Sequence, residues 1–185
     1  MQAPDQSPSR AKRLAIAAAA CCALAAPLVT QFEGRVTRTY PDVVYGWKVP
    51  TACDGHTGPE LRAGQTFTNA ECEAMLHQDL TKEFDGLAEC MPLDASTNEL
   101  AAYLSLAHNI GAGAVCRSSI PRKVKAGQHA AACATISEFR FVGGRDCALP
   151  EFARVCGGII RRRAAERSLC EGLLTASSAN STLTR

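Results

Sequence analysis

The fold of this chain is decided by residues 32–58, which read FEGRVTRTYPDVVYGWKVPTACDGHTG. This turn-rich stretch directly follows an apolar N-terminal segment and predicts a β-hairpin. Glu33 and Asp42 are nine residues apart, so the hairpin can hold their carboxyls on opposite sides of one sugar bond, with Thr51 on the returning strand. Of two carboxyl groups in different environments, one can act as general acid and the other as general base. The stretch therefore predicts glycoside hydrolysis close to a membrane.

Several short motifs connect this stretch with the rest of the chain. Glu33-Gly34 is followed by Tyr40 and Asp42, and then by VPTACDGHTG at residues 49–58. The downstream motifs read TNAEC at 68–72, AHNIGAGA at 107–114, GRDC at 144–147 and RRRAAERSLC at 161–170. In this order the motifs resemble the phage lysozyme family, glycoside hydrolase family 24, over residues 32–174.

The resemblance implies an α+β, mainly α fold, in which a small β-hairpin lobe joins a helical lobe and an apolar anchor helix precedes both. It implies that Glu33 is the general acid for the β-1,4 bond between N-acetylmuramic acid and N-acetylglucosamine in peptidoglycan. Asp42 and Thr51 would position and activate a water on the opposite face of the sugar ring, an inverting mechanism that needs no metal or cofactor. For His56 and Asn109 we expect either substrate contacts or structural roles.

One spacing departs from the family pattern. Relatives usually have five residues between the aspartate and the threonine, whereas residues 43–50 number eight here. We expect a longer hairpin tip to take up the difference. Tyr40 and Trp47 lie near this hairpin and are expected either to face sugar rings or to pack in the core.

The N-terminal segment predicts a membrane anchor. A basic stretch at residues 10–13 precedes an uncharged run at residues 14–32, which as a helix would span roughly 28 Å. Alanine is the commonest residue of this run and Pro27 interrupts it, so residence in a bilayer should be marginal. A cleaved signal peptide is the alternative, because Ala23-Leu24-Ala25 resembles a cleavage site.

The resemblance favours a signal-anchor-release endolysin, a subgroup in which an uncleaved anchor exports the enzyme and later leaves the bilayer. We expect a cytoplasmic basic region at 1–13, the anchor at 14–32, the catalytic domain at 33–174 and a disordered tail at 175–185. The catalytic domain would lie in the periplasm, held by the inner membrane and then released as a monomer. While the chain is anchored, Glu33 stays within about 15 Å of lipid and can hardly reach the wall.

The cysteine content predicts an oxidising compartment. Eight of the ten cysteines lie between residues 53 and 170 without a Cys-x2-Cys pair, which favours disulfides over zinc. Cys147 and Cys156 enclose a short loop and are the expected pair. Cys21 and Cys22 lie in the apolar run, either as small hydrophobic residues or, as in some relatives, as part of a redox switch that attacks a disulfide at Cys53.

Charge is distributed unevenly although the net charge is only +2. Residues 33–99 carry 5 basic and 12 acidic side chains, whereas residues 100–185 carry 12 basic and 5 acidic ones. The basic half could attract an anionic polymer such as a cell wall, with solvated helix faces as the alternative. No nucleic-acid-binding motif is recognised, so we expect no nucleic-acid partner. A non-catalytic peptidoglycan-binding protein of the envelope is the alternative function.

Overall fold

The apolar N-terminal run forms one long helix. In the computed structural model, which describes residues 9–42, 45–92 and 95–173, helix α1 spans Arg10–Glu33. The Ser9 hydroxyl accepts the Lys12 backbone N–H at its start, and Gly34 at φ 74° follows its last residue. By length and composition this helix could cross a membrane. The expected tail at 175–185 and the first part of the expected basic region lie outside the described residues.

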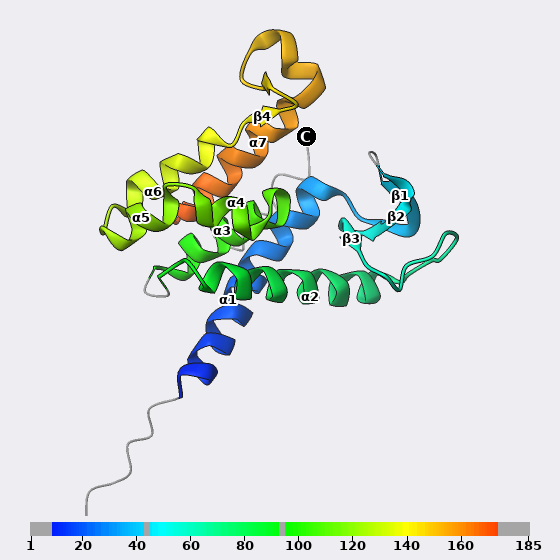
Figure 1. Cartoon of the computed structure of the whole chain (residues 1–185), viewed down its shortest axis with the longest axis horizontal. Helices are drawn as coiled ribbons and strands as arrows, with labels where there is room; N and C mark the ends of the chain where they lie inside the picture. The colour runs from blue at the N-terminus through cyan, green and yellow to red at the C-terminus, as the bar shows by residue number, and fades with distance from the viewer. Residues whose placement is uncertain (1–8, 43–44, 93–94, 174–185) are drawn as a thin grey trace, which may run out of the picture.

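Two small sheets and a group of helices follow α1 (Figure 1). The strands are β1 (Val36–Asp42), β2 (Gly46–Cys53), β3 (His56–Thr57), β4 (Phe141–Val142) and β5 (Arg145–Asp146). The α-helices are α2 (Asn69–Ala88), α3 (Thr97–Ile110), α4 (Ala112–Arg117), α5 (Ile120–Lys125), α6 (His129–Thr135) and α7 (Ala153–Cys170). Two short 3₁₀ helices are η1 (Ile136–Glu138) and η2 (Pro150–Phe152). The chain is thus mainly helical with a small β lobe.

The expected hairpin is present as the antiparallel pair β1 and β2, with β3 added on the far side of β2. Tyr40 lies opposite Thr51, which in turn lies opposite Thr57. The ladder is irregular near the tip, because Pro41 pairs with Pro50 whereas the next residue, Asp42, pairs with Gly46. The additional length expected at the hairpin tip is therefore taken up within β2, by residues 47–49.

Helix α2 connects the β lobe with the helical lobe (Figure 1). A capping box of Thr68 and Glu71 starts it, since each side chain accepts a backbone N–H of the other residue. Its buried side chains recur every three or four residues, as expected for one apolar helix face. These residues are Cys72, Leu76, Leu80, Phe84 and Leu87.

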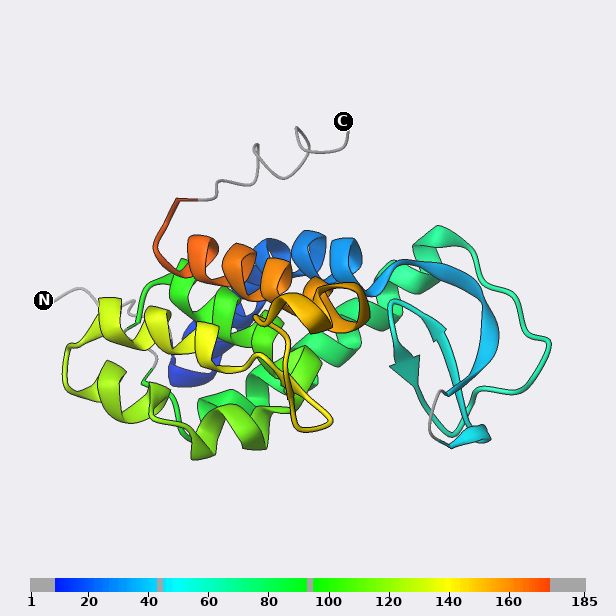
Figure 2. The same ribbon diagram turned by 90° about the horizontal axis from the view of Figure 1, so that it is seen from above.

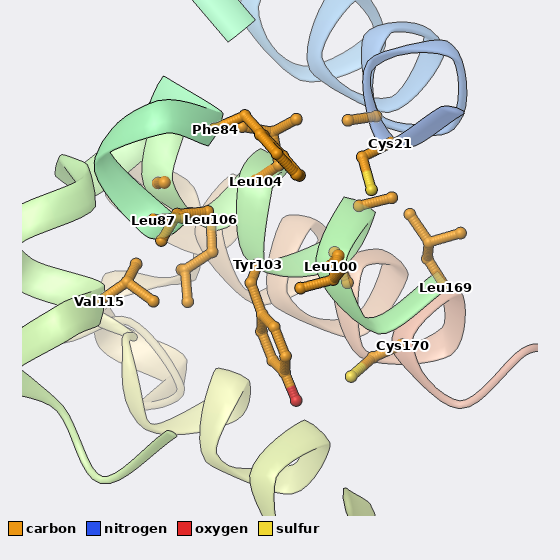
Figure 3. Packing of buried hydrophobic residues seen from close by; sticks show 14 of the residues in the cluster. Cys21, Phe84, Leu87, Leu100, Tyr103, Leu104, Leu106, Val115, Leu169 and Cys170 are labelled. Atoms are coloured by element: carbon orange, nitrogen blue, oxygen red, sulfur yellow. The ribbon is translucent and has the colours of Figure 1, made fainter. Parts of the chain in front are cut away.

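The main core surrounds α3, in which all residues from Glu99 to Ala107 are buried. Helix α1 packs directly against α3, and α7 covers another side of it (Figure 2). The buried residues Cys21, Cys22, Ala25 and Val29 of α1 are at most 1% exposed and belong to this core. Figure 3 shows Cys21 beside Leu100 and Leu169. The apolar N-terminal segment is therefore an integral part of the folded domain.

Four disulfides join the elements. Cys147 and Cys156, the pair expected from the sequence, are bonded to each other across the β5–α7 connection. The other three bonds join β2 to α2, the turn after α2 to α4, and α6 to α7; they are Cys53–Cys72, Cys90–Cys116 and Cys133–Cys170. Each bond can stabilise the fold by about 2–4 kcal/mol.

Candidate active site

Glu33 is the last residue of α1, where the helix meets the β lobe. Its side chain is 27% exposed, and its Oε1 accepts a hydrogen bond of 2.5 Å from Nη1 of Arg162 on α7. Arg162 itself is buried, with 4% of its side chain exposed. A guanidinium that donates to a carboxylate oxygen forms a charge-assisted hydrogen bond. The structure thus couples Glu33 to a fixed positive charge.

Arg162 is held by a network of buried polar groups. Its Nε donates to Glu166 Oε1 at 3.0 Å, and the Ser105 hydroxyl donates to the same oxygen at 3.0 Å. The Arg162 Nη2 donates to the Ser105 carbonyl at 3.3 Å. Because every partner lies on α3 or α7, the two helices fix the direction in which Arg162 reaches Glu33.

Arg163 and Glu166 form a second buried contact in this network. Their Nη1 and Oε2 atoms are 2.9 Å apart, but the alignment is too poor for a hydrogen bond, and both atoms lack a hydrogen-bond partner among the described residues. Burial raises the pKa of Glu166 and lowers the pKa of Arg163. The charge of each residue shifts the pKa of the other in the opposite direction, but burial has the larger effect. Burying this pair beside the Glu33 site is therefore costly.

Asp42 and Thr51 lie on the paired strands β1 and β2. The Asp42 Oδ1 accepts the Tyr45 backbone N–H at 2.7 Å, and the Thr51 hydroxyl donates to the Val49 carbonyl at 3.4 Å. Thr51 is 6% exposed. Asp42 is thus fixed by a hydrogen bond to the turn just before β2, and Thr51 by one to the outer part of β2.

Tyr40 lies within electrostatic range of three carboxylates. Burial raises the pKa of Tyr40, and the negative charges of Glu33, Asp42 and Asp54 raise it further. Three carboxylates from α1, β1 and the β2–β3 turn therefore act on one phenol. The placement of Glu33 and Asp42 on opposite sides of one sugar bond stays a prediction.

The β2–β3 turn passes close to Glu33. Gly55 has φ +88°, and a Cβ atom at this position would lie 3.7 Å from Glu33 Oε2 and 4.0 Å from His108 Nε2. The ring of His108 is within hydrogen-bond distance of Glu83 at Nδ1, 3.2 Å, and of the Asp54 carbonyl at Nε2, 3.3 Å. Burial lowers the pKa of His108, but the hydrogen bond to Glu83 and the nearby charges outweigh it and raise the pKa above its ordinary value.

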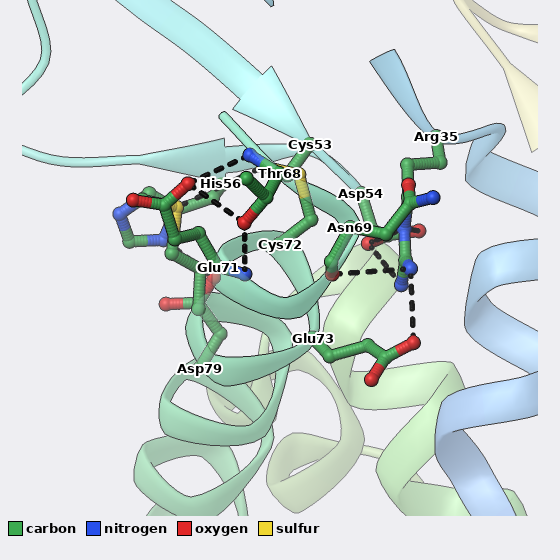
Figure 4. The surroundings of a disulfide bond; sticks show 11 residues. Arg35, Cys53, Asp54, His56, Thr68, Asn69, Glu71, Cys72, Glu73 and Asp79 are labelled. Carbon is green, nitrogen blue, oxygen red and sulfur yellow. Dashed lines mark hydrogen bonds and ion pairs between the residues drawn. A yellow bond between two sulfur atoms is a disulfide. The ribbon is translucent and has the colours of Figure 1, made fainter. Parts of the chain in front are cut away.

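Asp54 anchors the same turn to the start of the β lobe (Figure 4). Its carboxylate is 2.9 Å from Nη2 and 3.0 Å from Nε of Arg35, which also reaches Glu73 at 3.3 Å. The Cys53–Cys72 disulfide lies next to this ion pair. Charge pairing and a covalent bond therefore fix the turn that packs against Glu33.

His56 and Asn109 both contact other side chains of the protein. His56 lies 2.8 Å from Asp79 and 2.6 Å from Glu60 through its two ring nitrogens. The Asn109 Oδ1 accepts a hydrogen bond of 2.5 Å from Arg163 Nη2. These contacts favour the structural role among the two expected for each residue, and a contact with substrate stays a prediction.

Cys21 and Cys22 are buried free thiols in the described part of the chain. Cys53, the expected target of a redox exchange, is bonded to Cys72. The packing corresponds to the alternative in which both cysteines are small core residues, and the exchange stays a prediction.

The sequence did not identify Arg35, Asp54, Glu83 and His108 as neighbours of the site. A weak signal exists for Asp54, which stands in a turn beside Gly55 and is charged in a strand-rich stretch. His108 has no metal-like spacing to other ligands, and its position next to Glu33 depends on how α3 meets the β lobe. Among the described residues, no cluster of His, Cys, Asp and Glu is arranged to hold a metal ion.

A two-lobed helical fold with carboxylates gathered beside a β-hairpin is characteristic of lysozymes, and comparisons with known proteins agree. The family model described as phage lysozyme matches residues 30–166. The SAR-endolysin of Enterobacteria phage P21 is 32% identical over 167 residues, covering 85% of this chain and 94% of the relative. The SAR-endolysin of Bacteriophage PS119 is 32% identical over 138 residues, covering 75% of each chain.

Solved structures with the same fold include a P22 lysozyme mutant, with a TM-score of 0.65 and 25% identity over 78% of this chain and 92% of that one. The muramidase domain of SpmX from Asticaccaulis excentricus gives the same TM-score and identity over 77% and 91%. The chain belongs to the phage lysozyme family and is a glycoside hydrolase.

Proposed function

We propose that the protein is an endolysin that hydrolyses the β-1,4 bond between N-acetylmuramic acid and N-acetylglucosamine in peptidoglycan, acting as a monomer. The observation that carries the proposal is the position of Glu33 at the end of α1, directly before the hairpin strands that bear Asp42 and Thr51, with Arg162 bonded to Glu33. Family membership supports the same reaction. Glu33 is the general acid, and Asp42 with Thr51 serves the attacking water.

Glu33 donates its proton to the glycosidic oxygen as the bond opens. The carboxylate then becomes negative, and Arg162 already lies 2.5 Å from Oε1, so no reorganisation is needed to stabilise that charge. The Oε2 atom is on the side of the Gly55 turn. Because Oε1 is already bonded to Arg162, Oε2 is the oxygen that delivers the proton.

Asp42 and Thr51 lie on the hairpin strands β1 and β2, whereas Glu33 is the last residue of α1. An ionised Asp42 can accept a proton from water, and the Thr51 hydroxyl can orient that water. Attack from the face opposite to Glu33 inverts the anomeric carbon, which requires carboxyls roughly 6.5–9.5 Å apart. The product is therefore expected with inverted anomeric configuration.

Helix α1 is proposed to anchor the chain in the inner membrane before release into the periplasm. It could span a bilayer by length and composition, yet in the folded domain its buried face packs on α3. The same face of α1 cannot contact lipid and α3 at the same time. Helix α1 therefore packs on α3 only after it has left the membrane. Cleavage after Ala25 would remove Cys21, Cys22 and Ala25 from a core in which each is at most 1% exposed. This favours a retained anchor over a cleaved signal peptide.

Substitution of the acid tests the reaction. Glu33→Gln keeps the shape of the side chain but cannot donate a proton, so hydrolysis should fall roughly 10²- to 10⁴-fold with folding unchanged. Asp42→Asn should be similarly inactive, and Glu171→Gln, on the exposed end of α7, should keep full activity. Activity is followed by the release of muramic acid reducing ends from purified peptidoglycan, and NMR of the first product gives its anomer.

Two results would count against the proposal. Glu33→Gln with more than a tenth of wild-type activity would show that Glu33 is not the acid. Wild-type protein that binds peptidoglycan without releasing reducing ends would favour the non-catalytic alternative.

A further inference from the structure

The outer part of β2 contains three residues that interrupt the ladder with β1. Consecutive residues of β1, Pro41 and Asp42, pair with Pro50 and Gly46, which are four apart. Trp47, Lys48 and Val49 therefore lack ladder partners in the described sheet and form a bulge, called here the β2 bulge. Bulges of this kind commonly lie next to active sites, where they redirect side chains.

Hydrogen bonds fix the β2 bulge to both hairpin residues proposed to serve the attacking water. On one side Asp42 Oδ1 accepts the Tyr45 N–H at 2.7 Å, and the Tyr45 carbonyl accepts the Lys48 N–H at 3.3 Å. On the other side the Thr51 hydroxyl donates to the Val49 carbonyl at 3.4 Å. The bulge is thus continuous with the proposed catalytic residues and is held at both ends.

The aromatic side chains of this region are exposed. Trp47 is 51% exposed and Tyr45 is 64% exposed, so neither packs in a core. The expected alternative that Trp47 is a core residue is therefore wrong. Large aromatic rings at such exposure are typical of binding surfaces, because they offer an apolar face together with a polar N–H or O–H group.

We propose that Trp47 of the β2 bulge and Tyr45, in the turn just before β2, form an additional subsite that stacks on a pyranose ring of the glycan strand next to the cleaved bond. A sugar ring has an apolar C–H face that fits an aromatic plane and hydroxyls that suit the polar edges. The position of the bulge between Asp42 and Thr51 in the chain makes the substrate strand the occupant. This inference rests on the proposed function.

The sequence offers a direct probe, because Trp47 is its only tryptophan. The Glu33→Gln protein, which should bind but not cut, is titrated with soluble, uncross-linked glycan strands. Trp47 fluorescence should shift to shorter wavelength, and quenching by acrylamide should fall at least twofold at saturation. Binding of the same strands is measured in parallel by calorimetry.

Kinetics of variants in the active background give a second readout. Trp47→Ala should raise KM for glycan strands about five- to tenfold with kcat changed less than twofold, a loss typical of an aromatic contact. Trp47→Phe should restore most of the affinity. The matched control is Phe141→Ala, which removes a 61% exposed aromatic ring from β4.

The two measurements separate this inference from the proposed function. Strands that bind by calorimetry while the Trp47 emission and quenching stay unchanged would overturn the subsite and leave the proposed function intact. An unchanged KM in Trp47→Ala would do the same. If the strands neither bind nor are cut, the proposed function fails and this inference fails with it.

Discussion

The charged side chains around Glu33 are held in places that exclude water. Arg162, Arg163 and Glu166 are each at most 3% exposed. Interactions between such groups are weakly screened, so each depends strongly on its partner. The orientation of Arg162 toward Glu33 therefore requires Glu166, although Glu166 does not contact the substrate site itself.

Removing Glu166 should reveal this dependence. Glu166→Gln leaves the buried Arg163 without its ion-pair partner and Arg162 with Glu33 alone, so the free energy of unfolding should fall by about 3–5 kcal/mol. The matched control is Glu171→Gln, which breaks an exposed pair with Arg167 of the same i, i+4 spacing and should cost less than about 1 kcal/mol. Urea unfolding measures both. Equal losses in the two variants would show that the buried network is not coupled as described.

His56 should make stability depend on pH. Burial lowers the pKa of His56, but the hydrogen bonds to Glu60 and Asp79 outweigh it and raise the pKa above the unfolded value of about 6.5. The stabilisation is complete below this value and is lost as pH rises through the folded pKa. Wild-type protein should therefore lose more stability between pH 6 and pH 9 than His56→Asn. Urea unfolding of both proteins at both pH values measures this difference. Equal losses of stability in wild type and His56→Asn would show that His56 does not cause the pH dependence.

At the scale of elements, α1 has two different faces. Cys21, Ala25 and Val29 are buried against the domain, whereas Ala19 and Ala23 are exposed. The exposed face can become more apolar without disturbing the core, and the buried face cannot. The helix can therefore be altered separately as an anchor and as a core element.

Leucine substitutions on these faces should have different effects. Ala19→Leu with Ala23→Leu should hold the protein in the membrane, since each change favours insertion by some tenths of a kcal/mol. The detergent-extracted domain should remain as stable as wild type. Ala25→Leu should instead destabilise the extracted domain by about 1–3 kcal/mol through overpacking. Membrane fractionation and thermal unfolding distinguish the two, and equal stability of all variants would contradict the burial of Ala25.

The sequence was sufficient for the elements but not for the contacts between them. The hairpin, the capping box at Thr68 and the apolar run are local patterns that the structure retains. Asp54 pairs with Arg35, which is 19 positions away in the sequence. The Asp54 carbonyl contacts His108, which is 54 positions away. The first contact depends on the register of the hairpin, in which Val36 pairs with Cys53, and the second depends on how α3 meets the β lobe. No short sequence pattern specifies either contact.

For the whole molecule, the central feature is that the helix ending in Glu33 also completes the core. Helix α1 packs on α3, and its last residue meets Arg162 of α7. Folding of α1 onto the domain therefore both buries Cys21 and Cys22 and brings the proposed acid to its partner. Activity should appear only in a chain whose α1 is retained and packed.

Intact-mass measurement of the soluble species that cleaves peptidoglycan tests this claim most directly, with and without alkylation. We predict a chain that retains α1, in which two thiols are alkylated only after unfolding, because Cys21 and Cys22 are buried and the other eight cysteines form disulfides. An active species that begins near Ala26, without either thiol, would contradict it.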